Sequence, residues 1–252
     1  MKKILIFIAA ALLSAAASDA QGRYHGPHHD HYVSPAEGLG LHFGYVHSFN
    51  RISDKYSDDV DSSDGKNGFH VGMTKDFTLI PYALYIQSGL DYVYQMRTPD
   101  VTKIGSFKIL AKDQEHRINI PLKLKYEYPV TPMISAFAQV GPTFSFGLAS
   151  GLRYRARTDN GNAYVSYNYY TGKLKTGGDA GFMEEIVNSQ SPEAKYRRFD
   201  ALLGGAVGAK FFDILEASIG YDWGLVNQYR GNLGKDFAMR RQQLYVTLAV
   251  RF

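Results

Sequence analysis

Apolar and polar residues alternate one by one along much of the chain. In the C-terminal segment, apolar Leu244, Val246, Leu248, Val250 and Phe252 alternate with mostly polar neighbours. Alternation with a period of two is typical of a β-strand that has one apolar and one polar face. The same pattern appears in seven earlier segments, at residues 41–46, 69–74, 84–94, 117–127, 134–140, 199–207 and 215–223. The pattern therefore predicts eight strands.

Short and long connections alternate between these segments. Short turns are predicted at residues 76–81, 129–132 and 212–213, whereas the third long connection covers residues 150–197, roughly 48 residues against a usual 4–6. A closed barrel with short periplasmic turns and long exterior loops gives this alternation. We therefore expect an all-β fold: an eight-stranded antiparallel up-and-down transmembrane β-barrel with long exterior loops, over residues 39–252. Closure is required because backbone groups in lipid must pair within the protein.

The polar positions of the strands predict a charged barrel interior. Counting every second residue places ten ionisable side chains inside, and they are Asp91, Arg117, Lys123, Lys125, Glu127, Asp200, Lys210, Glu216, Asp222 and Arg251. Eight strands enclose a space that side chains can fill. Since acids and bases are equal in number, we expect a paired, filled interior. Pro121 cannot donate a hydrogen bond and should mark a bulge or break in its strand.

The first 20 residues have the three parts of an export signal. Lys2 and Lys3 precede an apolar run over residues 4–13, and small residues up to Ala20 follow, so cleavage is expected before Gln21. Residues 21–38 would then form a periplasmic tail. The tail carries four candidate metal ligands, His25, His28, His29 and His31. Imidazoles at this spacing are able to bind zinc or copper, but a solvated, flexible tail without a metal is the interpretation that the sequence favours.

Composition fits a chain that crosses a membrane as strands. The mean hydropathy is −0.25, which argues against a helical membrane protein, while aromatic residues make up 14% and there are 25 glycines. There is no cysteine, so no disulfide framework exists, and the net charge of +4 gives no indication of nucleic-acid binding. An exported, cysteine-free chain ending in an alternating strand and Phe252 resembles an outer-membrane barrel. We therefore predict the bacterial outer membrane as location, outer-membrane lipid and the barrel-assembly machinery as partners, and Leu248, Val250 and Phe252 as the assembly signal.

Three stretches resemble PorT-like outer-membrane β-barrels of the Bacteroidota. Residues 118–126 (INIPLKLKY) resemble the family strand EIPLLLKY, residues 136–142 (AFAQVGP) resemble YVGAGP, and residues 198–205 with 221–227 resemble the pair FDFGLVLGAG and RYSYGLTN. Asn119 stands where the family usually has Glu. The resemblance covers the barrel from the fourth strand onward. It implies an envelope protein, since one branch of the family takes part in a secretion system.

The third long connection holds the candidate partner-binding residues. Arginines alternate just beyond the fifth strand, and tyrosines gather around Val165; the candidates are Arg153, Arg155, Arg157, Tyr164, Tyr167, Tyr169 and Tyr170. Tyrosine gives a large contact area with a polar tip and is favoured at binding surfaces. In the alternative, the tyrosines cover the barrel mouth as a lid and the arginines only complement lipopolysaccharide. We also predict a strand around Val165.

These features favour a non-enzymatic outer-membrane protein without a cofactor. It would act through its exterior loops, as a binding platform or as a subunit of an envelope assembly with a protein partner. A lipid-modifying enzyme is the first alternative, because His47 and Ser48 lie at the outer end of the first strand. Adjacent strand residues point to opposite faces, so this pair is not expected to meet. A narrow channel is the second alternative.

Overall fold

The computed structural model describes residues 38–54, 57–61, 65–81, 83–98, 100–104, 107–158, 161–178, 195–230 and 237–252. They belong to one compact unit, Pro35–Phe252. No helix among them is long and apolar enough to cross a membrane. The strands are β1 (Leu39–Asp54), β2 (Ser57–Asp61), β3 (Lys66–Ile80), β4 (Leu84–Met96), β5 (Asp100–Ile104), β6 (Phe107–Thr131), β7 (Ile134–Thr158), β8 (Gly161–Asn168), β9 (Lys173–Gly177), β10 (Phe199–Phe211), β11 (Leu215–Gly224) and β12 (Ala238–Arg251).

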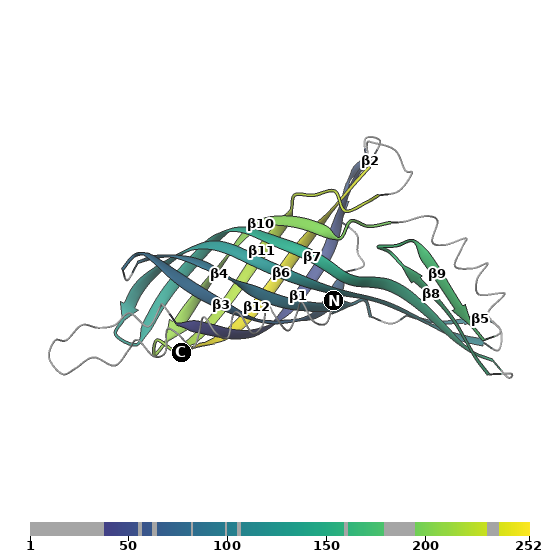
Figure 1. Cartoon of the computed structure of the whole chain (residues 1–252), viewed down its shortest axis with the longest axis horizontal. Helices are drawn as coiled ribbons and strands as arrows, with labels where there is room; N and C mark the ends of the chain where they lie inside the picture. The colour runs from purple at the N-terminus through teal and green to yellow at the C-terminus, as the bar shows by residue number, and fades with distance from the viewer. Residues whose placement is uncertain are drawn as a thin grey trace. The chain divides into compact units, whose positions relative to one another are not determined.

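Eight of the described strands close into a ring. Figure 1 shows how these strands run side by side around the barrel. Each strand pairs antiparallel with its neighbours in the order β1–β3–β4–β6–β7–β10–β11–β12. The ring closes where β12 pairs with β1, with Leu41 opposite Val250. A closed ring leaves no unpaired edge, which is the condition for crossing lipid as strands. The predicted eight-stranded antiparallel up-and-down barrel is therefore confirmed.

The short turns lie at one end of the ring, together with the start of β1 and the end of β12. The backbone N–H of Phe252 donates to the carbonyl of Leu39 over 3.1 Å. The predicted turn at Phe212 and Asp213 is confirmed, and both residues adopt the left-handed backbone region (φ 53° and 58°) that tight hairpins use. The predicted turn at 76–81 was too long, because β3 continues to Ile80. Asp76 is buried inside the ring, and an interior carboxylate looks like a turn residue in sequence.

The two faces of the ring have opposite polarity. Leu122 on the outer face is 43% exposed, whereas its neighbour Lys123 on the inner face is 3% exposed. All ten ionisable residues that were expected inside, by counting every second residue of each strand, lie on the inner face. Lipid contact explains the apolar outer face, because hydrocarbon cannot solvate charge. The predicted alternation of lipid-facing and interior positions is therefore confirmed.

Pro121 interrupts the pairing of β6 without shifting its register. Ser88 of β4 pairs with Leu122 and Asp91 pairs with Asn119, but no pairing is present between these two points. The missing N–H of proline explains this gap. The register shift in this part of the ring lies elsewhere, where β7 has one extra residue, Leu148, opposite His116 and Arg117.

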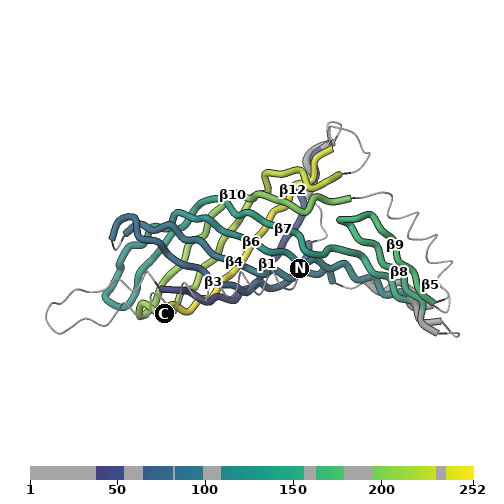
Figure 2. Tube along the Cα trace, in the orientation of Figure 1, coloured from purple at the N-terminus to yellow at the C-terminus, as the bar shows by residue number. Residues whose placement is uncertain are grey.

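β6 and β7 continue well beyond the ring at the end with the long connections. Both strands have 25 residues, β5 pairs with β6, β8 pairs with β7, and β9 pairs with β8. The result is a five-stranded extension, which we call the exterior sheet, and Figure 2 traces β8 and β9 beside the ends of β6 and β7. The strand predicted around Val165 is confirmed as β8. The connection predicted over residues 150–197 is thus built partly of strands.

Candidate functional site

The exterior sheet has its own small apolar core on one face. Ile109, Ala163 and Val165 are buried there, and Tyr154 and Leu174 pack against them. These residues come from β6, β7, β8 and β9, so the core ties four strands together. Because one face of the sheet is packed, the strands hold the other face in a fixed arrangement. A ligand that binds there loses less free energy to the ordering of the protein.

The opposite face of the exterior sheet is basic. The strand register places Lys112, Arg153, Ser166 and Lys175 in one row across β6 to β9. The next row holds Leu110, Arg155 and Tyr164. We call Lys112, Arg153, Arg155, Lys173 and Lys175 the basic face; Lys112 is half-buried and the other four are exposed. None of the described positions on this face is acidic.

The extra residue Leu148 decides that the arginines belong to this face. Within the ring, Thr143 and Ser145 of β7 point inward and are buried. Beyond the register shift the inward positions become even-numbered, beginning with buried Ser150. Arg153 and Arg155 therefore continue the outer face of the barrel. Arg157 lies in the same strand, opposite Asn162.

The four predicted tyrosines divide between two places. Tyr164 is 43% exposed and lies opposite Arg155 on the basic face. Tyr167 is buried, and its ring contacts Tyr169 at a centroid distance of 5.5 Å. Tyr169 in turn stacks on Tyr196, with centroids 4.7 Å apart and planes inclined by 16°. Only Tyr164 among the four thus presents a largely exposed ring.

Tyr170 lies over the mouth of the barrel. Its hydroxyl donates to Glu115 Oε1 over 3.2 Å, and the guanidinium of Arg198 lies 4.9 Å from the centre of its ring. Burial raises the pKa of Tyr196 to about 12 and also raises the pKa of Tyr169 and Tyr170, which widens the pH range over which the three phenols stay protonated. These contacts match the lid alternative for Tyr167, Tyr169 and Tyr170.

Ion pairs fill the interior in successive layers. Near the mouth, Glu115 lies 2.8 Å from Arg117 and 2.6 Å from Arg241. Further down, the ammonium of Lys123 lies 2.8 Å from Asp222. The expected pairing of interior charges is therefore present.

A layer closer to the short turns has four members. Lys125 lies 3.0 Å from Asp76 and 2.6 Å from Glu216, and Arg251 lies 2.9 Å from Glu216. Lys210 also pairs with Glu127. Asp76 had been expected in a turn rather than in the interior. Glu115 and Arg241 lie beyond the ends of the predicted strands.

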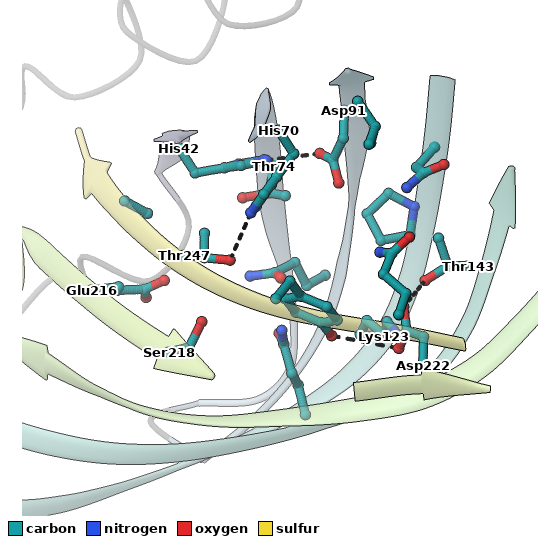
Figure 3. A pocket seen from close by; sticks show the side chains of 18 of the residues that line it. His42, His70, Thr74, Asp91, Lys123, Thr143, Glu216, Ser218, Asp222 and Thr247 are labelled. Carbon is teal, nitrogen blue, oxygen red and sulfur yellow. Dashed lines mark hydrogen bonds and ion pairs between the residues drawn. The ribbon is translucent and has the colours of Figure 1, made fainter. Parts of the chain in front are cut away.

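Between these layers the interior encloses a cavity of about 80 Å³, which Figure 3 shows from close by. His42, His70 and Asp91 line one side of it, and His42 Nε2 lies 2.8 Å from Asp91 Oδ1. Each of the three offers one ligand atom, and these atoms lie within 4.8 Å of one another. The alternation of strand residues had placed Asp91 inside, but His42 and His70 were not among the interior residues named from the sequence. Their positions on the polar faces of neighbouring strands were the available signal.

The other predicted site residues belong to the assembly signal, the N-terminal tail and the enzyme alternative. Leu248, Val250 and Phe252 are exposed at the outer surface of β12 and just after it. The tail histidines His25, His28, His29 and His31 lie outside the described residues. For the enzyme alternative, Ser48 is buried on the inner face, whereas His47 lies on the other face and contacts Asn67 Oδ1 through Nδ1 at 2.7 Å. His47 and Ser48 are thus held apart, as expected.

Three solved proteins are among the structures to which this chain is similar. Ail of Yersinia pestis, in complex with the heparin analogue sucrose octasulfate, is 10% identical over 86% of this chain and 99% of that chain, with a TM-score of 0.38. Neisserial surface protein A is 10% identical over 86% and 100%, with a TM-score of 0.34. OprG of Pseudomonas aeruginosa is 11% identical over 86% and 97%, with a TM-score of 0.40. No curated protein sequence matches the chain.

A family model gives the decisive comparison. The model described as "Outer membrane protein beta-barrel domain" matches residues 34–230, which include most of the ring and the exterior sheet. The match agrees with the closed ring, its apolar outer face and its charged interior. The chain therefore belongs to the outer membrane protein beta-barrel domain family and is a β-barrel protein of the bacterial outer membrane.

Proposed function

We propose that this protein is a non-enzymatic binding platform of the outer membrane, and that the basic face of its exterior sheet binds an envelope partner through clustered anionic groups. The observation that carries the proposal is a surface of Lys112, Arg153, Arg155, Lys173 and Lys175 on a sheet with its own packed core. Tyr164, exposed beside Arg155, adds a ring with a polar tip.

The spacing of the charges supports an anionic partner. Lys112 and Arg153 are directly opposite each other on neighbouring strands. Like charges in this position destabilise a sheet. A ligand that carries negative charge would remove this repulsion, and it would be held by both side chains at once. An Arg guanidinium also suits carboxylate and phosphate groups, because it donates two parallel hydrogen bonds.

The test compares two double variants in copurification from native membranes, with bound partners identified by mass spectrometry. Arg153→Gln/Arg155→Gln removes two charges of the basic face. Arg51→Gln/Arg240→Gln is the matched control, because these exposed arginines also lie opposite each other, in β1 and β12, but off the basic face. We expect the first variant to lower partner affinity about 5-fold or more, which corresponds to ~1 kcal/mol, and the control to leave it unchanged.

Salt provides an independent measurement. Binding through exposed charges should weaken as ionic strength rises, because the screening length falls to about 8 Å at 0.15 M. Equal partner recovery from both variants would contradict the proposal. Phosphate analysis of the purified protein distinguishes the two kinds of partner, because tightly bound lipopolysaccharide would contribute phosphate.

Two narrower assignments rest on the sequence alone. We propose that the protein is of the PorT-like type and that it serves an envelope or secretion assembly, on the strength of residues 118–126 and the other matching stretches. We also propose that residues 1–20 are removed before Gln21. N-terminal sequencing of protein purified from outer membranes tests the cleavage, and the copurified partners test the assembly.

A further inference from the structure

The cavity inside the barrel holds three side chains that are typical metal ligands. His42 comes from β1, His70 from β3 and Asp91 from β4, and the two histidines are buried. Figure 3 shows His42, His70 and Asp91 turned toward one another at the edge of the cavity. We propose that they bind one divalent transition-metal ion, with Zn²⁺ as the best match.

Two glycines make the space in which these side chains meet. Gly72 of β3 lies opposite His42 on one side and Asp91 on the other. A Cβ on Gly72 would lie 2.6 Å from Asp91 Oδ1, so any side chain there would push into the carboxylate. Gly44 lies opposite His70, and a Cβ on Gly44 would collide with that imidazole ring. The backbone is thus shaped around the three ligands.

The distances fit a single ion. Zinc holds nitrogen and oxygen ligands at about 2.0–2.2 Å, so the ligand atoms of one ion lie roughly 3–4 Å apart. The three ligand atoms here lie within 4.8 Å of one another, and His42 Nε2 is 2.8 Å from Asp91 Oδ1. Small side-chain rotations therefore suffice to place all three around an ion. The cavity of about 80 Å³ has room for a water molecule at a fourth position.

The charge balance of the interior also points to a cation here. Among the described residues, the other interior carboxylates each lie within 4.0 Å of a lysine or arginine; they are Asp76, Asp113, Glu115, Glu127, Asp200, Glu216 and Asp222. The ion-pair partner of Asp91 is His42, which is neutral unless it gains a proton. Asp91 is half-buried, and a carboxylate that is largely removed from water with no lysine or arginine beside it is costly. A bound metal ion would supply that charge.

Two imidazoles and one carboxylate form a recognised ligand set. Zinc sites with three protein ligands of this kind keep a fourth position for water, and the same set also suits other divalent metals. Thr247 Oγ1 lies 3.3 Å from His70 Nε2, which leaves Nδ1 of His70 as the nitrogen for the metal. Such a second hydrogen bond orients a ligand histidine, and its loss commonly weakens metal affinity about 10–100-fold.

The test is a titration of the folded full-length chain with Co²⁺. Visible absorption reports binding, because Co²⁺ absorbs strongly when only a few ligands coordinate it. The tail histidines are competing ligands, so the background chain carries His25→Gln, His28→Gln, His29→Gln and His31→Gln. We expect one Co²⁺ per chain in this background, displaced by Zn²⁺. His42→Gln, His70→Gln and Asp91→Asn should abolish it, and Thr247→Val should weaken it about 10–100-fold.

His116→Gln is the matched control, because His116 lies on the outer face with Tyr92, whose hydroxyl is 2.6 Å from its Nδ1. Gel mobility before and after heating shows that each variant is folded. His70→Gln keeps the His42–Asp91 pair intact, so it remains informative if the other two variants do not fold. A folded background chain that binds no Co²⁺, or binding that survives His70→Gln, would overturn the proposal.

Discussion

Single residues in this protein differ in role according to the face on which they lie. Leu122 and Lys123 are neighbours in β6, yet Leu122 meets lipid and Lys123 forms an ion pair with Asp222 in the interior. The period of two made this difference predictable from sequence. Asp76 shows the limit, because an aspartate near a hairpin fits both a turn and an interior ion pair. The structure distinguishes these two assignments, because it places Lys125 beside Asp76 in the barrel interior.

Leu122→Arg should destabilise the barrel by about 2–4 kcal/mol, because Leu122 lies near the middle of the part of β6 that crosses lipid. The measurement is the free energy of unfolding in lipid vesicles, with Leu122→Ile as the control. We expect the control to stay within about 1.5 kcal/mol of the original chain. A tolerated arginine would mean that Leu122 does not face hydrocarbon.

Lys123→Gln should cost about 3–5 kcal/mol, because it leaves the carboxylate of Asp222 buried without its cation. The double variant Lys123→Gln/Asp222→Asn should recover part of this loss, since both charges are then absent. Unfolding free energies of the two single variants and the double variant give the coupling energy. Strictly additive effects would show that the two groups do not interact.

At the scale of elements, the strands exceed the membrane and build a second structure. β6 and β7 continue into the exterior sheet, where Val165 is fully buried against Ile109 and Ala163. The sequence predicted a strand at Val165, but it did not predict that four further strands would join it in one sheet. Each pair in this sheet joins strands that follow one another along the chain, such as β5 and β6 through Ile104↔Phe107 and β7 and β8 through Thr158↔Gly161. Alternation along one strand does not report how far that strand stays paired with the next one.

Val165→Asp should unfold the exterior sheet while the ring stays intact. A buried carboxylate without a partner is costly, and the ring has its own pairing and lipid contacts. Trypsin should then cut at Arg155, Lys173 and Lys175, which are protected in a folded sheet. Ser166→Asn, on the opposite face, is the control and should stay resistant. If the variant also loses the change of gel mobility on heating that marks a folded ring, the ring and the exterior sheet fold as one unit.

At the scale of the whole molecule, closure depends on the last strand. β12 pairs with β1 from Ser53↔Ala238 to Gly40↔Arg251, and Phe252 adds a hydrogen bond to Leu39. The outer surface of β12 and the residue after it present Leu248, Val250 and Phe252. The chain end is thus both the seam of the barrel and an exposed apolar segment.

Deletion of Phe252 should reduce the amount of folded protein in the outer membrane, because the exposed apolar end that we predict as the assembly signal is shortened. Surface labelling of whole cells and heat-modifiable gel mobility measure the effect. Phe252→Tyr keeps an aromatic ring and should be tolerated. Normal surface levels of the truncated chain would refute the assignment of this residue to assembly.

The alternation of residues in the sequence was enough to predict the eight strands of the ring, their two faces and the charged character of the interior. These follow from a period of two and from the demand that lipid places on backbone and side chains, which are local properties of each strand. Which interior groups meet follows instead from the way the strands pair. His42 and Asp91 come together over Gly72 because β1, β3 and β4 have a particular register, and register is set by closure of the whole ring. The face of Arg153 and Arg155 likewise depends on the extra residue Leu148, since one residue reverses the alternation of a strand.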